Sequence, residues 1–216
     1  MGVKRWGLGL LVTTMLLTGC GENPAESVYQ HLEAAVELEM PFEQQQEPLQ
    51  KAELRENELF EQIISLGLNE FDQIVELADE AIASINARES MLAQEKESIE
   101  ESYLEFTQIE EKRETIEDEE MVNLLNELAE TMNKRYDSYQ NLYGSYEEAI
   151  QLDQQLFQML QKEDVTMESL QEQINLVNDI YEKVNNHKEN FNSYTDEYNS
   201  LKREFYEKAE LNVQYD

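Results

Sequence analysis

Helix-breaking residues are almost absent from most of this chain. All three prolines, Pro24, Pro41 and Pro48, lie near the start, and the 168 residues that follow Pro48 contain none. Five of the seven glycines lie within the first 21 residues, which leaves only Gly67 and Gly144 beyond them. A multi-stranded sheet and a glycine-rich phosphate loop both need turn residues that this chain lacks. Long helices are therefore predicted.

Apolar periodicity divides the chain into helical regions. A first region begins near Val28, and Pro41 and Pro48 should break or kink it. Gly67 then indicates a helix end and Asn69 the next N-cap. Three longer regions with apolar residues at heptad spacing follow, at about 69–116, 121–160 and 166–205.

The connections between these regions indicate how they pack. Residues 115–120 contain neither glycine nor proline, but a turn is expected there because an uninterrupted helix of about 90 residues would be exceptional. The connections near Gly67 and Asp164 are short, with Thr166 as the N-cap that follows, and short connections make neighbouring helices antiparallel. The predicted fold is all-α, an elongated antiparallel bundle of three long helices with an additional kinked N-terminal helix.

Polar residues interrupt the apolar seams at Arg88, Glu95, Ser102, Arg113, Arg135 and Asp153. Four of them, Arg88, Arg113, Arg135 and Asp153, are charges that need a partner. A buried charge is costly unless it is paired, so antiparallel helices could bring acidic partners to these arginines and fix the register. Alternatively, the charges line an open groove that receives a ligand.

The first 20 residues have the pattern of a cleavable lipoprotein signal. Two basic residues precede an uncharged stretch at 6–17, which is shorter than the roughly 20 residues that a membrane span needs. It ends in two small residues and Cys20, the only cysteine in the chain. We expect cleavage between Gly19 and Cys20, and a diacylglycerol on Cys20 that anchors the protein to the outer face of the cell membrane. Residues 1–19 would be the signal, 20–27 the lipidated cysteine with a short tether, and 28–213 a single elongated helical domain.

The charge of the chain is strongly negative. It has 48 Asp and Glu against 16 Lys and Arg, a net charge of −32. Such a balance excludes nucleic acid as a partner, because phosphate binding requires basic patches. Anionic wall polymers are repelled as well. Wall binding would therefore depend on contacts between aromatic rings and sugars, on divalent cations, or on a cationic protein partner.

Residues for catalysis or metal binding are sparse. His31 and His187 lie in separate regions without a second histidine or a cysteine nearby, so neither a zinc site nor a Ser–His–Asp arrangement is predicted. The acidic run at 117–120 does not have the spacing of a calcium loop. We expect no catalytic residues, no metal site and no cofactor.

An asparagine stripe marks the last helical region. Its members recur every seven residues, each directly after a core residue, with tyrosines in the same stretch: Asn178, Asn185, Asn192, Asn199, Tyr194 and Tyr198. Amides and phenol rings bind sugars and peptide backbones, but they are also ordinary flank residues of a bundle. A ligand face at Asn185, Asn192, Tyr194, Tyr198 and Asn199 is therefore one of two hypotheses.

The order of several short segments along the chain carries a resemblance. They lie at 20–21, 29–33, 36–39, 45–49, 58–60, 63–67, 95–98, 135–136, 191–195, 198–199 and 205–206. In these segments the chain resembles the YkyA family of cell-wall-binding lipoproteins from Gram-positive bacteria, over nearly its whole length. The resemblance implies a long-helix fold, a surface location and wall binding, and it brings no catalytic motif.

Two functions of different classes follow from these observations. The first is a non-enzymatic, membrane-tethered module that binds cell-wall glycan or a cationic envelope protein, or that acts as a spacer in the envelope. The alternative is an extracytoplasmic protein-interaction subunit, such as an accessory to an envelope enzyme or a secretion chaperone.

Overall fold

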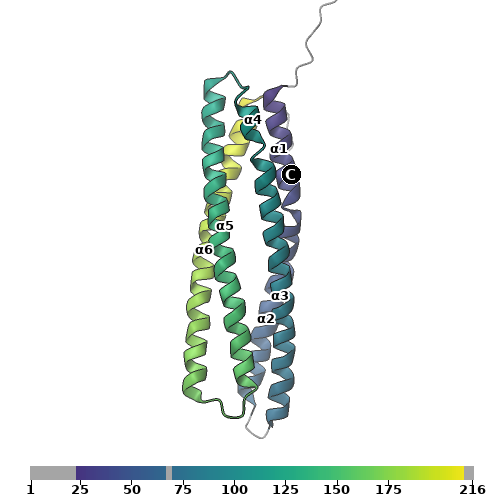
Figure 1. The fold of residues 1–216 in the computed structure, drawn as a ribbon, viewed down its shortest axis with the longest axis vertical. Helices are drawn as coiled ribbons and strands as arrows, with labels where there is room; N and C mark the ends of the chain where they lie inside the picture. Colours follow the sequence, from purple (N-terminus) through teal and green to yellow (C-terminus); the bar gives the residue numbers. More distant parts are fainter. Residues whose placement is uncertain (1–22, 67–69, 212–216) are drawn as a thin grey trace, which may run out of the picture.

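The protein is an elongated all-α bundle in the computed structural model, which describes residues 23–66 and 70–211 (Figure 1). The helices of these ranges are α1 (Pro24–Leu38), α2 (Met40–Ser65), α3 (Phe71–Phe106), α4 (Ile109–Arg113), α5 (Glu119–Leu160) and α6 (Met167–Lys208). Because α1 continues into α2 and α3 into α4, the six helices form four rods, which run antiparallel to their neighbours. The all-α bundle is confirmed. The kinked N-terminal helix expected beside three long helices corresponds to α1 and α2, which are longer together than expected and form a fourth full-length rod.

The start of α1 differs from the expected tether. The Asn23 side chain accepts a hydrogen bond from the Ala25 amide at 3.1 Å, and Pro24 occupies the first turn, where its missing N–H costs nothing. The side chains of Ala25 and Ser27 are buried. The helix therefore begins inside the segment 20–27, because its first turn already packs into the core. Gly19, Cys20 and the signal at 1–19 lie outside the described residues.

The other helix ends follow local sequence. Asp118 caps α5 by accepting from the amides of Glu120 and Met121 at 2.9 and 3.0 Å. Thr166 caps α6 by accepting from the Ser169 amide at 3.1 Å, which confirms the predicted N-cap. The turn expected at 115–120 is present. Gly67 and Asn69 lie outside the described residues, and α3 begins at Phe71.

The junction of α1 and α2 contains an inserted serine. The Ser98 hydroxyl of α3 donates to the Leu38 carbonyl at 2.5 Å and accepts from the Phe42 amide at 3.2 Å. In an unbroken helix, that amide and that carbonyl would bond to each other. The break lies just before Pro41, as expected, whereas α2 continues through Pro48.

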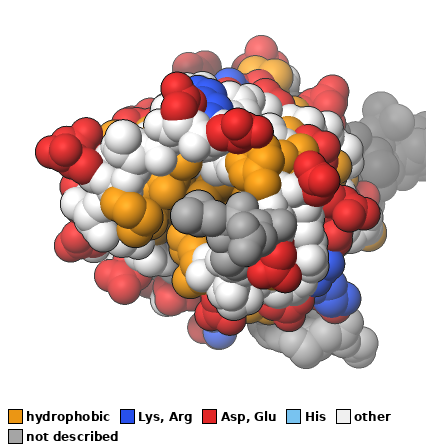
Figure 2. All heavy atoms as spheres, turned by 90° about the horizontal axis from the view of Figure 1, so that it is seen from below, with side chains coloured by type: hydrophobic (Ala, Val, Ile, Leu, Met, Phe, Trp, Pro, Cys, Tyr) orange, Lys and Arg blue, Asp and Glu red, His pale blue; other side chains and the backbone are white. Residues whose placement is uncertain are grey.

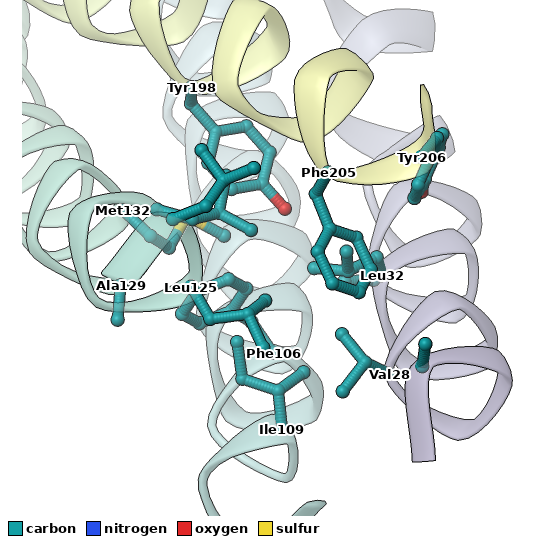
Figure 3. Close-up of a cluster of buried hydrophobic side chains, with 14 residues drawn as sticks. Val28, Leu32, Phe106, Ile109, Leu125, Ala129, Met132, Tyr198, Phe205 and Tyr206 are labelled. Carbon is teal, nitrogen blue, oxygen red and sulfur yellow. The ribbon is translucent and has the colours of Figure 1, made fainter. Parts of the chain in front are cut away.

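The apolar core is closed at the end of the bundle where α1 begins. Figure 3 shows this cluster, to which α1, α3, α4, α5 and α6 all contribute side chains, among them Val28, Phe106, Ile109, Leu125 and Phe205. Large side chains complete the link between α1 and α6: the rings of Tyr29 and Tyr206 lie 5.1 Å apart. In the other half, α2 packs on α3 and α5 on α6, and these pairs meet along α3 and α5.

The outer surface is acidic. Figure 2 views the bundle from the end where α2 leads toward α3 and α5 toward α6, and acidic side chains lie around most of its outline, whereas basic ones are few. Within the described residues, no helix combines the length and apolar character that a membrane span requires.

Candidate ligand groove

A groove lies between α2 and α6, which pack on α3 and α5, respectively, more closely than on each other. It consists of two adjoining hollows of about 430 and 640 Å³, which share Glu53, Tyr181 and Asn185 in their linings. Volumes of this order are typical of small-molecule sites. At the end toward α1, the groove is bounded by Phe42 and Phe191, whose rings lie 5.7 Å apart.

The floor of the groove holds a buried charge network centred on Arg88. This side chain is 0% exposed. Its Nη2 lies 2.5 Å from Asp153 Oδ2 and 3.0 Å from Glu56 Oε2, and its Nη1 donates to the Tyr181 hydroxyl at 2.7 Å. The Tyr181 hydroxyl in turn donates to Asp153 at 2.7 Å. The network therefore ties together α2, α3, α5 and α6 beneath the groove.

Burial perturbs the acids of this network. It raises the pKa of Glu56 to about 7, although the charge of Arg88 and the hydrogen bond from Ser84 act in the opposite direction. Burial also raises the pKa of Asp153, again against the influence of Arg88. A single guanidinium thus serves several carboxylates, and the network carries a surplus of acid.

A second network closes the groove near the α1–α2 junction. The Arg135 guanidinium binds the Glu39 carboxylate through two bonds, at 2.7 and 2.6 Å, and donates from Nε to Thr195 at 2.9 Å. It also lies 4.9 Å from the centre of the Phe191 ring. Arg113 instead makes a local pair with Glu110, at 2.5 Å, because the short helix α4 leaves it near the surface.

Two of the four seam charges, Arg88 and Arg135, find the acidic partners across the bundle that the sequence predicted, whereas Arg113 does not. Arg88 pairs with Asp153 across the bundle and Arg135 with Glu39, as register-setting pairs would. The Arg88 network also borders the groove, since Glu56 and Asp153 belong to its lining.

Glu95 is a buried carboxylate in the larger hollow. It is 4% exposed, and it accepts a hydrogen bond from the Gln46 side-chain amide. Burial, reinforced by the charge of Glu53, raises its pKa to about 8. Among the described residues, no basic side chain forms an ion pair with it. In the sequence, only its heptad position indicated that Glu95 would be buried. Glu53, which lines both hollows, does not occupy such a position and was not predicted.

The asparagine stripe lies along the groove for most of its length. Asn178 and Asn185 line the smaller hollow, and Asn185 and Asn192 the larger. Asn199 is half-buried and belongs to neither lining. The stripe therefore supplies amides to one rim of the groove, up to Asn192.

The two tyrosines proposed with the stripe are not on this rim. Tyr198 is only 4% exposed and packs its ring against Phe106 at 5.9 Å, so it belongs to the core and cannot stack on a ligand. Tyr194 lies beside His187 in a shallow depression between α5 and α6. The five residues therefore do not form one face, because their helical positions point to different neighbours.

The histidines are far apart and serve local contacts. His31 Nδ1 lies 2.7 Å from Glu105 Oε1, and His187 Nδ1 lies 2.8 Å from the Ser145 hydroxyl. Within residues 23–66 and 70–211, no group of three or more potential ligands is arranged to hold a metal ion.

Comparison with known proteins connects this architecture to a family. The family model YkyA, described as "Putative cell-wall binding lipoprotein", matches residues 23–208. A curated relative, "Uncharacterized lipoprotein YkyA" of Bacillus subtilis (strain 168), is 33% identical over 201 residues, which cover 93% of this chain and 90% of the relative. A crystal structure of a conserved Staphylococcus aureus protein of unknown function aligns with a TM-score of 0.47 and 12% identity over 86% of this chain and 96% of that one, a likeness too distant to inform function. The chain belongs to the YkyA family.

Proposed function

We propose that this protein is a non-enzymatic, lipid-anchored module of the cell envelope, which holds a wall-associated ligand in the groove between α2 and α6. The family description supports the cell-wall lipoprotein part of this proposal. The observation that carries the rest is the groove itself, with the amides of Asn178, Asn185 and Asn192 along one rim.

The chemistry of the groove suits binding rather than catalysis. Its rim offers amide donors and acceptors, and its walls offer aromatic faces at Phe42, Tyr146 and Phe191. Its floor is held in place by the Arg88 network, whose members are joined by hydrogen bonds and an ion pair across four helices. A rigid floor reduces the entropy that a ligand would otherwise lose in ordering its site.

The position of the groove along the rod supports a ligand in the wall. Phe42 lies 18 residues beyond Pro24, which at 1.5 Å per residue places the near end of the groove about 27 Å from the start of α1. With a lipid on Cys20, the closed apolar end of the bundle would face the membrane, and the groove would open beyond it.

A protein partner is the second candidate. The net charge of −32 and the acidic outline of the bundle in Figure 2 complement a cationic envelope protein. This attraction would weaken in high salt, whereas stacking on sugars would not.

The test compares two sets of asparagine replacements on α6. The rim variant replaces Asn178, Asn185 and Asn192 with Ala. A matched control makes the same change at three exposed asparagines outside both linings of the groove, which are Asn175, Asn186 and Asn190. Retention is measured on purified wall sacculi and on membrane-stripped envelope proteins.

We expect the rim variant to lose retention while its melting temperature and that of the control stay unchanged. Release by salt alone would identify a cationic partner, and release by chelator would identify cation bridging. Equal retention of the rim variant and the control would overturn the groove as the binding site.

A further inference from the structure

Glu95 differs from the other buried acids at the groove in having no cationic partner among the described residues. Glu56 and Asp153 share Arg88. Glu95 has the amide of Gln46 as its hydrogen-bond donor. An amide satisfies one lone pair but does not neutralise a carboxylate charge.

Such a carboxylate is costly to keep inside a protein. A buried acid without a cation either pays a large desolvation penalty or remains protonated, and burial indeed raises the pKa of Glu95 to about 8. A glutamine or an apolar residue at this heptad position would avoid that cost. The carboxylate faces the larger hollow, of about 640 Å³, whose lining includes it.

The walls around Glu95 suit a cation on an apolar stem. The rings of Phe42, Tyr146 and Phe191 and the side chains of Leu92 and Leu142 line the same hollow. Aromatic faces attract cations, and aliphatic walls bury methylene groups. A primary ammonium is a compact charge that can bind a single carboxylate oxygen, whereas a guanidinium binds best to both oxygens of one carboxylate, as Arg135 does to Glu39. Gln46 already occupies one oxygen of Glu95.

We propose that Glu95 and the hollow above it form a subsite for a primary ammonium group of the ligand. The proposal rests on the groove being the binding site and names the chemistry that one part of it selects. An ammonium beside Glu95 stabilises its ionised form, so binding should lower the pKa of this carboxyl and release protons near neutral pH.

The charged and titratable groups around the subsite favour a cation. The charged or titratable residues that line the hollow from the other helices are Glu47 and Glu53 on α2, Tyr146 on α5, and Tyr181 and Lys188 on α6. Tyr139 on α5 is buried nearby, and its hydroxyl has no hydrogen-bond partner among the described residues. Lys188 is the one cation in this lining. As the internal competitor for Glu95, it should weaken ammonium binding, and Lys188→Met should strengthen it.

The experiment uses Nα-acetyl-lysine methylamide as probe and the norleucine analogue, which lacks only the ammonium group, as its neutral match. Amide resonances of the folded protein are followed by NMR during titration at pH 7. Calorimetry in two buffers of different ionisation enthalpy measures the protons released. The variants are Glu95→Gln, Lys188→Met and, as a control that removes one carboxylate from the exposed side of α3, Glu97→Gln.

The expected result is saturable binding of the lysine probe, with shifts at Gln46 and its neighbours and the release of close to one proton. Glu95→Gln should weaken binding at least tenfold and abolish the proton release, Glu97→Gln should leave both unchanged, and Lys188→Met should tighten binding. Because glutamine keeps the hydrogen bond with Gln46 and removes a buried charge, the Glu95→Gln variant is expected to fold.

Equal binding of the norleucine analogue, or lysine-probe binding that is unaffected by Glu95→Gln, overturns the ammonium subsite. Retention on sacculi separates this failure from that of the groove. If the asparagine rim variant loses retention while Glu95→Gln keeps it, the ammonium subsite is wrong and the groove stands. If neither variant loses retention, both proposals fail.

Discussion

Replacing Arg88 with methionine removes the cation that holds the groove floor together. Methionine matches the length of the arginine stem and fills irregular space without adding charge. The change leaves Glu56 and Asp153, which are 5% and 7% exposed, without their counter-charge. Breaking a buried ion pair by removing one partner costs about 3–5 kcal/mol, because the remaining charge is buried and unpaired.

This cost is large relative to the stability of a domain, which is of the order of 5–15 kcal/mol. With a denaturant slope of about 2 kcal/mol per molar urea, a loss of about 4 kcal/mol moves the unfolding midpoint by about 2 M. The measurement is urea unfolding of the soluble chain from residue 22, followed by circular dichroism at pH 7.5.

Two comparisons make the Arg88→Met prediction specific. Without the guanidinium, the pKa values of Glu56 and Asp153 should rise further, so the loss of stability should shrink as both acids protonate toward pH 5. The compensated variant Arg88→Met, Glu56→Gln, Asp153→Asn should recover most of the loss at pH 7.5. A loss below about 1 kcal/mol, or one that does not vary with pH, would refute the view that Arg88 neutralises these acids.

Four further predictions follow from other positions. Burial raises the pKa of Glu56 to about 7 and that of Glu95 to about 8. Each protonated carboxyl therefore contributes stability that is fully present below about pH 4.5, the pKa in the unfolded chain, and that is lost as pH rises through the pKa in the folded protein. Glu56→Gln and Glu95→Gln should each flatten the fall in melting temperature between pH 5 and pH 9. Ser98→Ala leaves the two backbone groups at the α1–α2 break without their bridge and should cost about 1–3 kcal/mol in urea unfolding, whereas Ser98→Thr should cost less. Gly144→Ala should raise stability by about 0.5–1 kcal/mol, because an added Cβ meets nothing within 4 Å and alanine loses less entropy in a helix; a destabilised variant would mean that α5 bends there. Cys20→Ala should release the protein from membranes or leave an unprocessed precursor, and it should abolish labelling by a fatty-acid probe; wild-type fractionation with labelling retained would contradict the anchor.

The helices could be predicted from sequence because local signals agree along most of the chain. Heptad spacing, the lack of glycine and proline after Pro48, and the cap at Thr166 all point to the same elements. The N-terminal rod was harder, because its two internal prolines have different effects. Pro41 lies at the start of α2, whereas Pro48 is accommodated inside it: its missing N–H frees the carbonyl of Gln44, which is an exposed residue where water can hydrate it.

The groove was only partly predictable. The spacing of the asparagines identified one face of α6, and the seam positions identified Arg88 and Asp153. Whether that face is open depends on how far α2 stands from α6, which no local pattern encodes. Tyr198 illustrates the limit, because its heptad position placed it in the core while its residue type suggested a ligand contact; burial decided in favour of the core.

The serine-bridged break between α1 and α2 separates two segments of one rod that differ in local stability. Five of the 15 residues of α1 are buried, but only four of the 26 residues of α2, because α2 borders the groove. With few buried contacts, α2 should open more often than α1, and its amide hydrogens should exchange faster although the two segments are joined end to end. The break at Glu39 allows this opening to stop at residue 40 instead of propagating into the closed core. A ligand that bridges α2 and α6 would then slow exchange in α2 alone, so binding at the groove would be recorded as protection of a single helix.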